Sequence, residues 1–150
     1  MNKFYLALVL FMASTAAVAG AWGVGSFDND GALDWIDQCL ESRDTAAIVL
    51  ALNTSLKTKM IEEPDGAAAI AAAEVVAASM GKPGKDFPDS LRAWLQLQSR
   101  EEIAKLGPSA RKALVRIRDP KLSELKQLWS QSKSKEWDER IVELQSRLTN

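Results

Sequence analysis

The sequence predicts an all-α protein, a single compact bundle of six or seven helices around a central alanine-rich helix. Apolar residues recur at helical spacing along most of the chain, and no sustained alternation of apolar and polar residues indicates a strand. Eight alanines fall between Ala67 and Ala78. A helix with this composition has no polar face, so we expect it in the centre of the bundle.

Capping residues and apolar spacing define the first three helices. Acidic and amide side chains precede a helix over residues 31–42, whose apolar positions follow a helical period. Asp44 can cap a second helix over residues 45–59. The alanine-rich third helix opens near Pro64, which suits a first helical turn, and runs to about Met80.

The second half of the chain carries the same signals. A fourth helix begins at Phe87-Pro88-Asp89, and a short helical piece follows near residues 101–106. Another helix starts at Pro108. The last segment, Leu122–Leu148, is apolar at helical spacing, but the polar stretch 130–135 is expected to break or loosen it.

The N-terminus has the pattern of a secretory leader. Lys3 precedes an apolar run over residues 4–19, which ends in the small-x-small sequence Ala17-Val18-Ala19. A transmembrane anchor is the alternative, but the run is shorter than the roughly 20 residues that cross a bilayer. We therefore predict a cleavable signal peptide over residues 1–19, cleaved after Ala19, with residues 20–150 forming one domain in the periplasm or outside the cell.

Composition excludes several kinds of chemistry. The chain has no histidine and one cysteine, so it holds no Ser–His or Cys–His pair, no histidine metal site and no internal disulfide. Cys39 lies on an apolar stripe and is expected in the core, an intermolecular disulfide being the alternative. The near-neutral charge argues against nucleic acid as a partner and against strong binding to anionic membranes. No stable membrane insertion is expected after signal cleavage. No cofactor, metal ligand or catalytic residue is assigned.

Glu74 is the one charged residue in the middle of the alanine-rich helix. A carboxylate there is costly unless it is paired or hydrogen-bonded. Three interpretations remain open: the side of the helix that carries Glu74 reaches solvent, Glu74 is a buried structural acceptor, or Glu74 is a catalytic acid with a raised pKa. For the buried case, the expected partners are backbone N–H groups of residues 22–25, a tryptophan indole, Arg92 or Arg111.

The acidic segment after the leader has competing interpretations. Asp28 and Asp30 suit helix capping and compensation of the helix dipole. Counted from Ser26, several residues up to Asp37 also follow the order of a calcium-binding loop, although Ser26 and Asp37 themselves depart from it. A surface that binds a partner is the third interpretation. A basic strip, Arg111 to Arg118, is expected to be a solvated helix face or a partner-binding surface.

Three motifs give the chain a family resemblance. They are G-x-W-G-x-G-x-F-D-N-D from Gly20, A-A-A-E-V-V-A-A from Ala71, and S-E-L-x-x-L-W from Ser123. With these motifs the chain resembles a bacterial domain-of-unknown-function family, number four-two-five-nine (DUF4259), of which it would be an exported member. The resemblance implies a compact helical fold in which Glu74 and Glu124 matter, and it supplies no catalytic residues.

The leading hypothesis for function is a small exported binding or interaction protein, without enzymatic activity, that meets a protein partner in the cell envelope. The alternatives are a carboxylate-dependent hydrolase that uses Glu74 with another acidic residue, and a divalent-cation-binding protein that uses Asp28–Asp37. Four of the five tryptophans are expected in the core, Trp22 being the exception. The candidate binding residues, expected to act mainly as a structural anchor, are Trp22, Gly23, Gly25, Phe27, Asp28, Asp30, Glu74 and Glu124.

Overall fold

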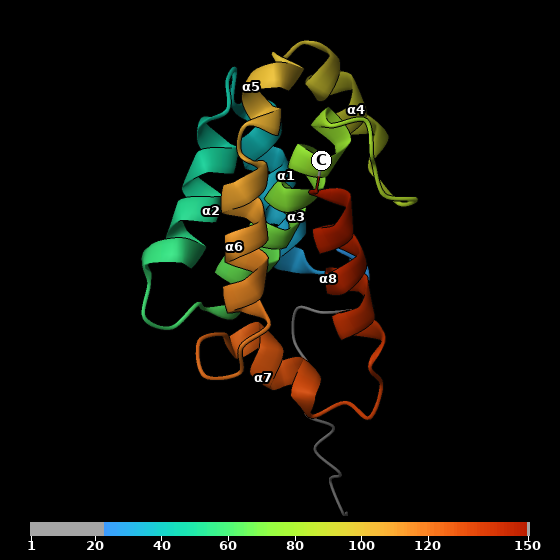
Figure 1. The fold of residues 1–150 in the computed structure, drawn as a ribbon. Coiled ribbons are helices and arrows are strands. Elements are labelled where there is room, and N and C mark those ends of the chain that lie inside the picture. Colours follow the sequence, from blue (N-terminus) through green and yellow to red (C-terminus); the bar gives the residue numbers. More distant parts are fainter. Residues whose placement is uncertain (1–22, 150) are drawn as a thin grey trace, which may run out of the picture.

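The computed structural model describes residues 23–149. The predicted signal peptide and Trp22 lie outside these residues. The described part of the chain contains eight helices and no strand (Figure 1). The helices are α1 (Asp30–Glu41), α2 (Ala46–Lys57), α3 (Glu63–Ser79), α4 (Asp89–Gln96), α5 (Arg100–Ala104), α6 (Gly107–Ile117), α7 (Glu124–Ser130) and α8 (Glu136–Arg147). The predicted all-α fold is confirmed.

The number of helices is eight where the sequence predicted six or seven. The difference arises in the last predicted segment, Leu122–Leu148, which forms two helices, α7 and α8. The interruption falls at residues 131–135, within the polar stretch that was expected to loosen this segment.

The alanine-rich helix α3 occupies the centre of the bundle, as predicted. It contacts each of the other seven helices that the structure describes, and every residue from Ala69 to Ser79 is buried. Small side chains let neighbouring helices approach closely, which explains how a helix of 17 residues can be surrounded on all sides. In Figure 1, α2 and α6 lie side by side to the left of α3, and α8 lies to its right.

Local side-chain contacts explain where the helices begin. The Asn29 side chain accepts a hydrogen bond from the Ala32 N–H and caps α1, while Ser99 and Ser123 cap α5 and α7 in the same way. The side chain of Glu62, the residue before α3, does not cap this helix. Glu124, which is distant in sequence, caps it instead.

Aromatic side chains fill the spaces around α3. Trp35, Trp94 and Trp137 are buried, as expected, whereas Trp129 is only partly buried and stacks on Trp137 with ring centroids 6.2 Å apart. None of the helices between residues 23 and 149 is both long and apolar enough to cross a membrane.

Cys39 is fully buried in the core, in agreement with the prediction. Burial raises the pKa of its thiol from 9.0 to about 12. Because the folded-state pKa exceeds the unfolded value, the stability gained from the neutral thiol is fully present below about pH 9 and is lost as the pH rises towards 12.

We expect the Cys39 thiol of the folded protein to resist a colorimetric disulfide reagent at pH values below 9, because a buried neutral thiol is a poor nucleophile. In urea the same thiol should react at the rate of an unfolded peptide. The measurement is the absorbance of the released thiolate against time. Rapid labelling without urea would place Cys39 at the surface.

Candidate functional site

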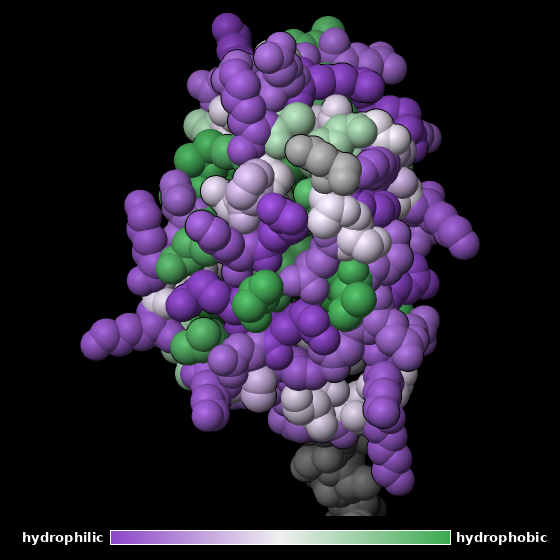
Figure 2. Space-filling view, viewed as in Figure 1, coloured by the Kyte–Doolittle hydropathy of each residue, from purple (hydrophilic) through white to green (hydrophobic). Residues whose placement is uncertain are grey.

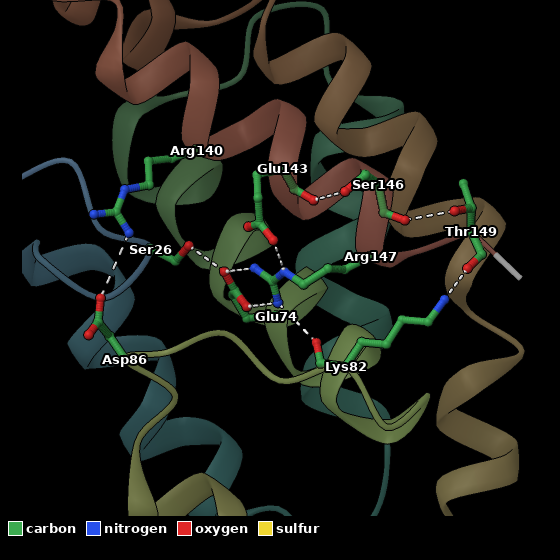
Figure 3. A network of polar contacts seen from close by, with 9 residues as sticks. All are labelled: Ser26, Glu74, Lys82, Asp86, Arg140, Glu143, Ser146, Arg147 and Thr149. Carbon is green, nitrogen blue, oxygen red and sulfur yellow. Dashed lines mark hydrogen bonds and ion pairs between the residues drawn. The ribbon is translucent and has the colours of Figure 1, made fainter.

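The centre of the candidate site is the carboxylate of Glu74, which lies midway along α3 and is 5% exposed. Two side chains hold it (Figure 3). Ser26 Oγ donates to Oε1 at 2.7 Å, and Arg147 donates from Nη2 to Oε1 at 2.9 Å and from Nη1 to Oε2 at 2.8 Å. Both carboxylate oxygens are therefore hydrogen-bonded, and a bidentate ion pair neutralises the charge.

Arg147 belongs to the last turn of α8 and joins three parts of the molecule. Its Nε donates to Glu143 on the same helix at 2.7 Å, and its Nη1 also donates to the backbone oxygen of Lys82 at 3.1 Å. Burial acts to lower the pKa of Arg147, but hydrogen bonds to Glu74 and Glu143, together with their charges, outweigh it and raise the pKa. The guanidinium therefore stays charged at any physiological pH.

This geometry corrects the partners expected for Glu74. The side of α3 that carries Glu74 does not reach solvent, and neither of the two proposed arginines contacts the Glu74 carboxylate. Arg92 pairs with Asp89 at 3.7 Å, and Arg111 is exposed on α6. Within the described residues, no backbone N–H of the N-terminal segment bonds to Glu74, which instead accepts from a side chain, that of Ser26. The hypothesis of a buried structural acceptor describes Glu74 best.

A tight turn before α1 presents Ser26 to Glu74. Asp28 Oδ2 accepts from the Gly25 N–H at 3.0 Å, and the Asp28 N–H donates to the Gly25 oxygen at 3.1 Å. A Cβ atom on Gly23 or Gly25 would lie 2.7 or 2.5 Å from Asp28 Oδ2. The glycines are thus required to make room for Asp28, and they do not bring backbone to Glu74 as expected.

Phe27 from the same turn meets Phe87 edge to face, with ring centroids 6.1 Å apart. Asp30 lies exposed in the first turn of α1. The motif therefore has two internal tasks, since it starts α1 and fixes the loop that follows α3 against the N-terminal segment.

Glu124 caps the beginning of α3. Its Oε2 accepts from the Glu63 N–H at 3.2 Å, and its own N–H donates to the Ile61 oxygen at 3.0 Å. A negative charge at a helix N-terminus compensates the helix dipole. The neighbouring Leu125 packs on Gly66, where a Cβ atom would lie 3.4 Å from Leu125 Cδ2. The S-E-L motif is thus the joint between α7 and α3.

Two of the carboxylates considered as catalytic partners of Glu74, Asp30 and Glu124, lie beside Glu63 instead. Burial raises the pKa of the Glu63 carboxyl, and the charges of Asp30 and Glu124 raise it further. These groups lie at the start of α3, whereas Glu74 is eleven residues on, or about 16 Å along the helix. Between residues 23 and 149, no three acidic, cysteine or histidine side chains are grouped to hold a metal ion.

A pocket of about 500 Å³ adjoins the Glu74–Arg147 pair. Its walls come from three elements: residues 25–27, the loop 83–87 and the side of α8 that carries Arg140 and Glu143. Gly84 lies directly over the pair, since a Cβ atom there would be 3.1 Å from Glu74 Oε2. Because residue 84 is a glycine, the loop 83–87 can lie against the Glu74–Arg147 pair, and no side chain of residue 84 fills the pocket.

A model of the family named Domain of unknown function (DUF4259) matches residues 20–140. The chain belongs to the DUF4259 family. No curated protein and no solved structure matches the chain significantly. The family assignment thus confirms the resemblance drawn from the sequence motifs, and it brings no activity with it.

The three motifs on which the resemblance was based converge on α3. The N-terminal turn supplies Ser26, the alanine-rich motif supplies Glu74, and the S-E-L motif caps the same helix through Glu124. Arg147 lies beyond the matched residues, and 73 positions separate it from Glu74. From the sequence, the burial of Glu74 indicates that a cation must pair with it. It does not indicate which of the arginines or lysines does so.

The second candidate site of this DUF4259 chain is a surface, which we call the α6–α8 face. It consists of five cationic and two apolar side chains: Arg111, Lys112, Val115, Arg118, Lys126, Lys135 and Val142. Val115 and Val142 are 62% and 47% exposed. Figure 2 shows this side of the molecule as hydrophilic, with separate apolar side chains among polar ones.

Two shallow hollows mark the α6–α8 face, with volumes of about 320 and 570 Å³. Arg118 and Lys126 share one carboxylate, that of Asp138. Arg111, Lys112 and Lys135 form no ion pair with any described residue.

Arg116, which the sequence grouped with the basic strip, has a structural role instead. It donates to the backbone oxygens of Ser55 and Thr58 and so caps the end of α2. Of the other cations of the strip, Arg111 and Lys112 are exposed, whereas Arg118 is half-buried and paired with Asp138.

Removing either partner of the Glu74–Arg147 pair should destabilise the fold strongly, because the other charge is left buried. We expect Glu74→Gln and Arg147→Met each to lower the free energy of unfolding by about 3–5 kcal/mol. The double variant should lose less than the sum of the two. Urea unfolding of the mature chain measures all three.

The matched control is Glu143→Gln, which removes a contact of the same arginine at a carboxylate that is 57% exposed. Its expected cost is about 0–1 kcal/mol. If the two single losses added to within about 0.5 kcal/mol in the double variant, the pair would not be coupled.

Proposed function

We propose that this DUF4259 protein is an exported, non-enzymatic binding protein that contacts an acidic segment of a protein partner through the α6–α8 face. The observation that carries the proposal is the set of cations on that face without ion pairs, which surround two exposed valines. Nothing in the described residues favours the hydrolase or the cation-binding alternative to the same degree.

Charge explains what kind of partner fits. Five cations against the three nearby carboxylates Asp138, Glu139 and Glu143 leave a positive excess on the α6–α8 face. A local excess of one sign steers a partner of opposite charge and fixes its orientation. Val115 and Val142 supply apolar contact, since burial of such side chains provides the non-directional part of binding. An acidic segment with apolar residues meets both requirements.

The carboxylates that could support hydrolysis already serve the fold. Glu74 is paired with Arg147, Asp28 accepts from the Gly25 N–H, and Glu124 accepts from the Glu63 N–H. A general acid or base needs a proton that it can exchange with substrate. These three groups are more simply understood as structural, which leaves surface recognition as the better-supported function.

Export follows from the predicted leader over residues 1–19, and it is tested separately. Expressed in a bacterial host, the full chain should yield a mature protein that begins at Gly20 and appears in the periplasmic fraction or the medium. Mass spectrometry of the intact protein gives the cleavage position. Retention of Met1–Ala19 in a soluble cytoplasmic protein would contradict export.

Binding is tested by crosslinking in the envelope fraction with the tagged mature chain, residues 20–150, as bait. We expect one dominant partner, captured less at high salt because exposed charges are screened. The variant Arg111→Glu with Lys112→Glu should reduce capture by about tenfold or more, since like charges then oppose the partner.

The matched control reverses two exposed cations outside the α6–α8 face, Arg43→Glu with Arg100→Glu, and changes the net charge equally. It should capture the partner as the unmodified chain does. Equal loss in both variants would mean that only net charge matters, and equal capture in both would remove the face from the proposal.

A further inference from the structure

We propose that the pocket beside the Glu74–Arg147 pair binds a small zwitterion, namely a free amino acid or short peptide with an apolar side chain. This site lies on another side of α8 from the α6–α8 face, with Glu143 at the border of both, and it does not depend on the proposed protein partner. Three features of the pocket specify the ligand: free cationic donors, free carboxylate acceptors, and an aromatic wall.

The size and position of the pocket suit a ligand of this kind. Its volume is about 500 Å³, within the roughly 300–1,000 Å³ typical of small-molecule sites. It opens between residues 25–27, the loop 83–87 and α8. In Figure 3 Ser26 lies to the left of the Glu74–Arg147 pair and Glu143 lies above it, with Arg140 and Asp86 beyond Ser26.

Arg140 and Lys85 offer positive charge to a ligand carboxylate. The Arg140 guanidinium lies 3.9 Å from both Asp86 and Glu136, which is too far for a hydrogen bond, and its side chain is 47% exposed. Lys85 forms no ion pair or hydrogen bond with the side chains of the described residues. A carboxylate can accept two parallel hydrogen bonds from an arginine in this state.

Glu143 and Asp86 offer negative charge to a ligand ammonium. Glu143 Oε1 accepts from Arg147, while its Oε2 accepts no hydrogen bond from a described residue. Asp86 is 76% exposed and has only the long contact with Arg140. Either carboxylate can therefore take an ammonium group without breaking a hydrogen bond of the fold.

The charges lining the pocket balance, and this balance selects for a zwitterion. Three cations and three carboxylates line the pocket. One of each, Arg147 and Glu74, neutralise each other. A purely anionic ligand would be repelled by Glu143 and Asp86. A purely cationic ligand would meet the same difficulty at Arg140. Only a ligand with both charges satisfies both sides.

The apolar part of the ligand has a wall of its own. Phe27 and Phe87 form an edge-to-face pair at the pocket, and Pro83 lines it beside them. Aromatic rings bury apolar groups with a large contact area. Gly84 keeps the loop free of a side chain at this point, because a Cβ atom there would press on Glu74 and Arg147.

The test uses the mature chain with three zwitterions of increasing length: phenylalanine, alanyl-phenylalanine and dialanyl-phenylalanine. Calorimetric titration should give saturable binding for at least one of them. Its N-acetylated and C-amidated counterparts, each lacking one charge, should bind at least about tenfold more weakly. Amide shifts in nuclear magnetic resonance spectra should concentrate in residues 25–27 and 83–87.

Two variants locate the site. Arg140→Gln should weaken binding at least about tenfold while leaving the melting temperature unchanged, because its ion pairs are long and exposed. Arg100→Gln, on exposed α5, is the control and should bind as the unmodified chain does. Absence of saturable binding by all three zwitterions up to about 10 mM overturns the proposal. So does equal affinity for a counterpart that lacks one charge, or unchanged affinity in Arg140→Gln.

Discussion

A carboxylate enclosed within an alanine-built helix is the constraint on which the rest of this fold depends. Glu74 is 5% exposed and cannot remain charged there without compensation. The Glu74–Arg147 pair supplies it, and the hydrogen bond from Ser26 completes it. In consequence the N-terminal turn, the central helix, the loop after it and the C-terminal helix all meet at one point.

The three family motifs are best understood together, as parts that fix α3. The alanines allow seven helices to approach it, Glu124 satisfies its first turn, and the glycine turn delivers Ser26 to its middle. Such roles concern packing and polar satisfaction, which are internal to the fold. The two surfaces proposed for recognition, the α6–α8 face and the pocket beside the Glu74–Arg147 pair, are lined mostly by residues outside the motifs, with Phe27 and Lys126 among the exceptions.

Periodicity and capping residues were enough to predict the helix class, the central place of α3 and the buried thiol of Cys39, because these depend on local pattern. The need of Glu74 for a partner also followed from burial alone. The identity of that partner did not, since 73 residues separate it from Arg147 and a contact across that distance depends on the tertiary path. The expected role of Gly25 was wrong for a different, local reason: its space is taken by Asp28, three residues on in the same turn.

The position of Arg147 in the chain has a consequence for synthesis. A polypeptide emerges from the ribosome from its N-terminus, so α3 is complete long before the last turn of α8 exists. Until then Glu74 has no counter-ion, and enclosing it would carry the full desolvation cost of an isolated carboxylate. The nascent chain therefore cannot close around its own centre early. Completion of the core waits for Arg147, which follows Glu74 by 73 positions in the chain.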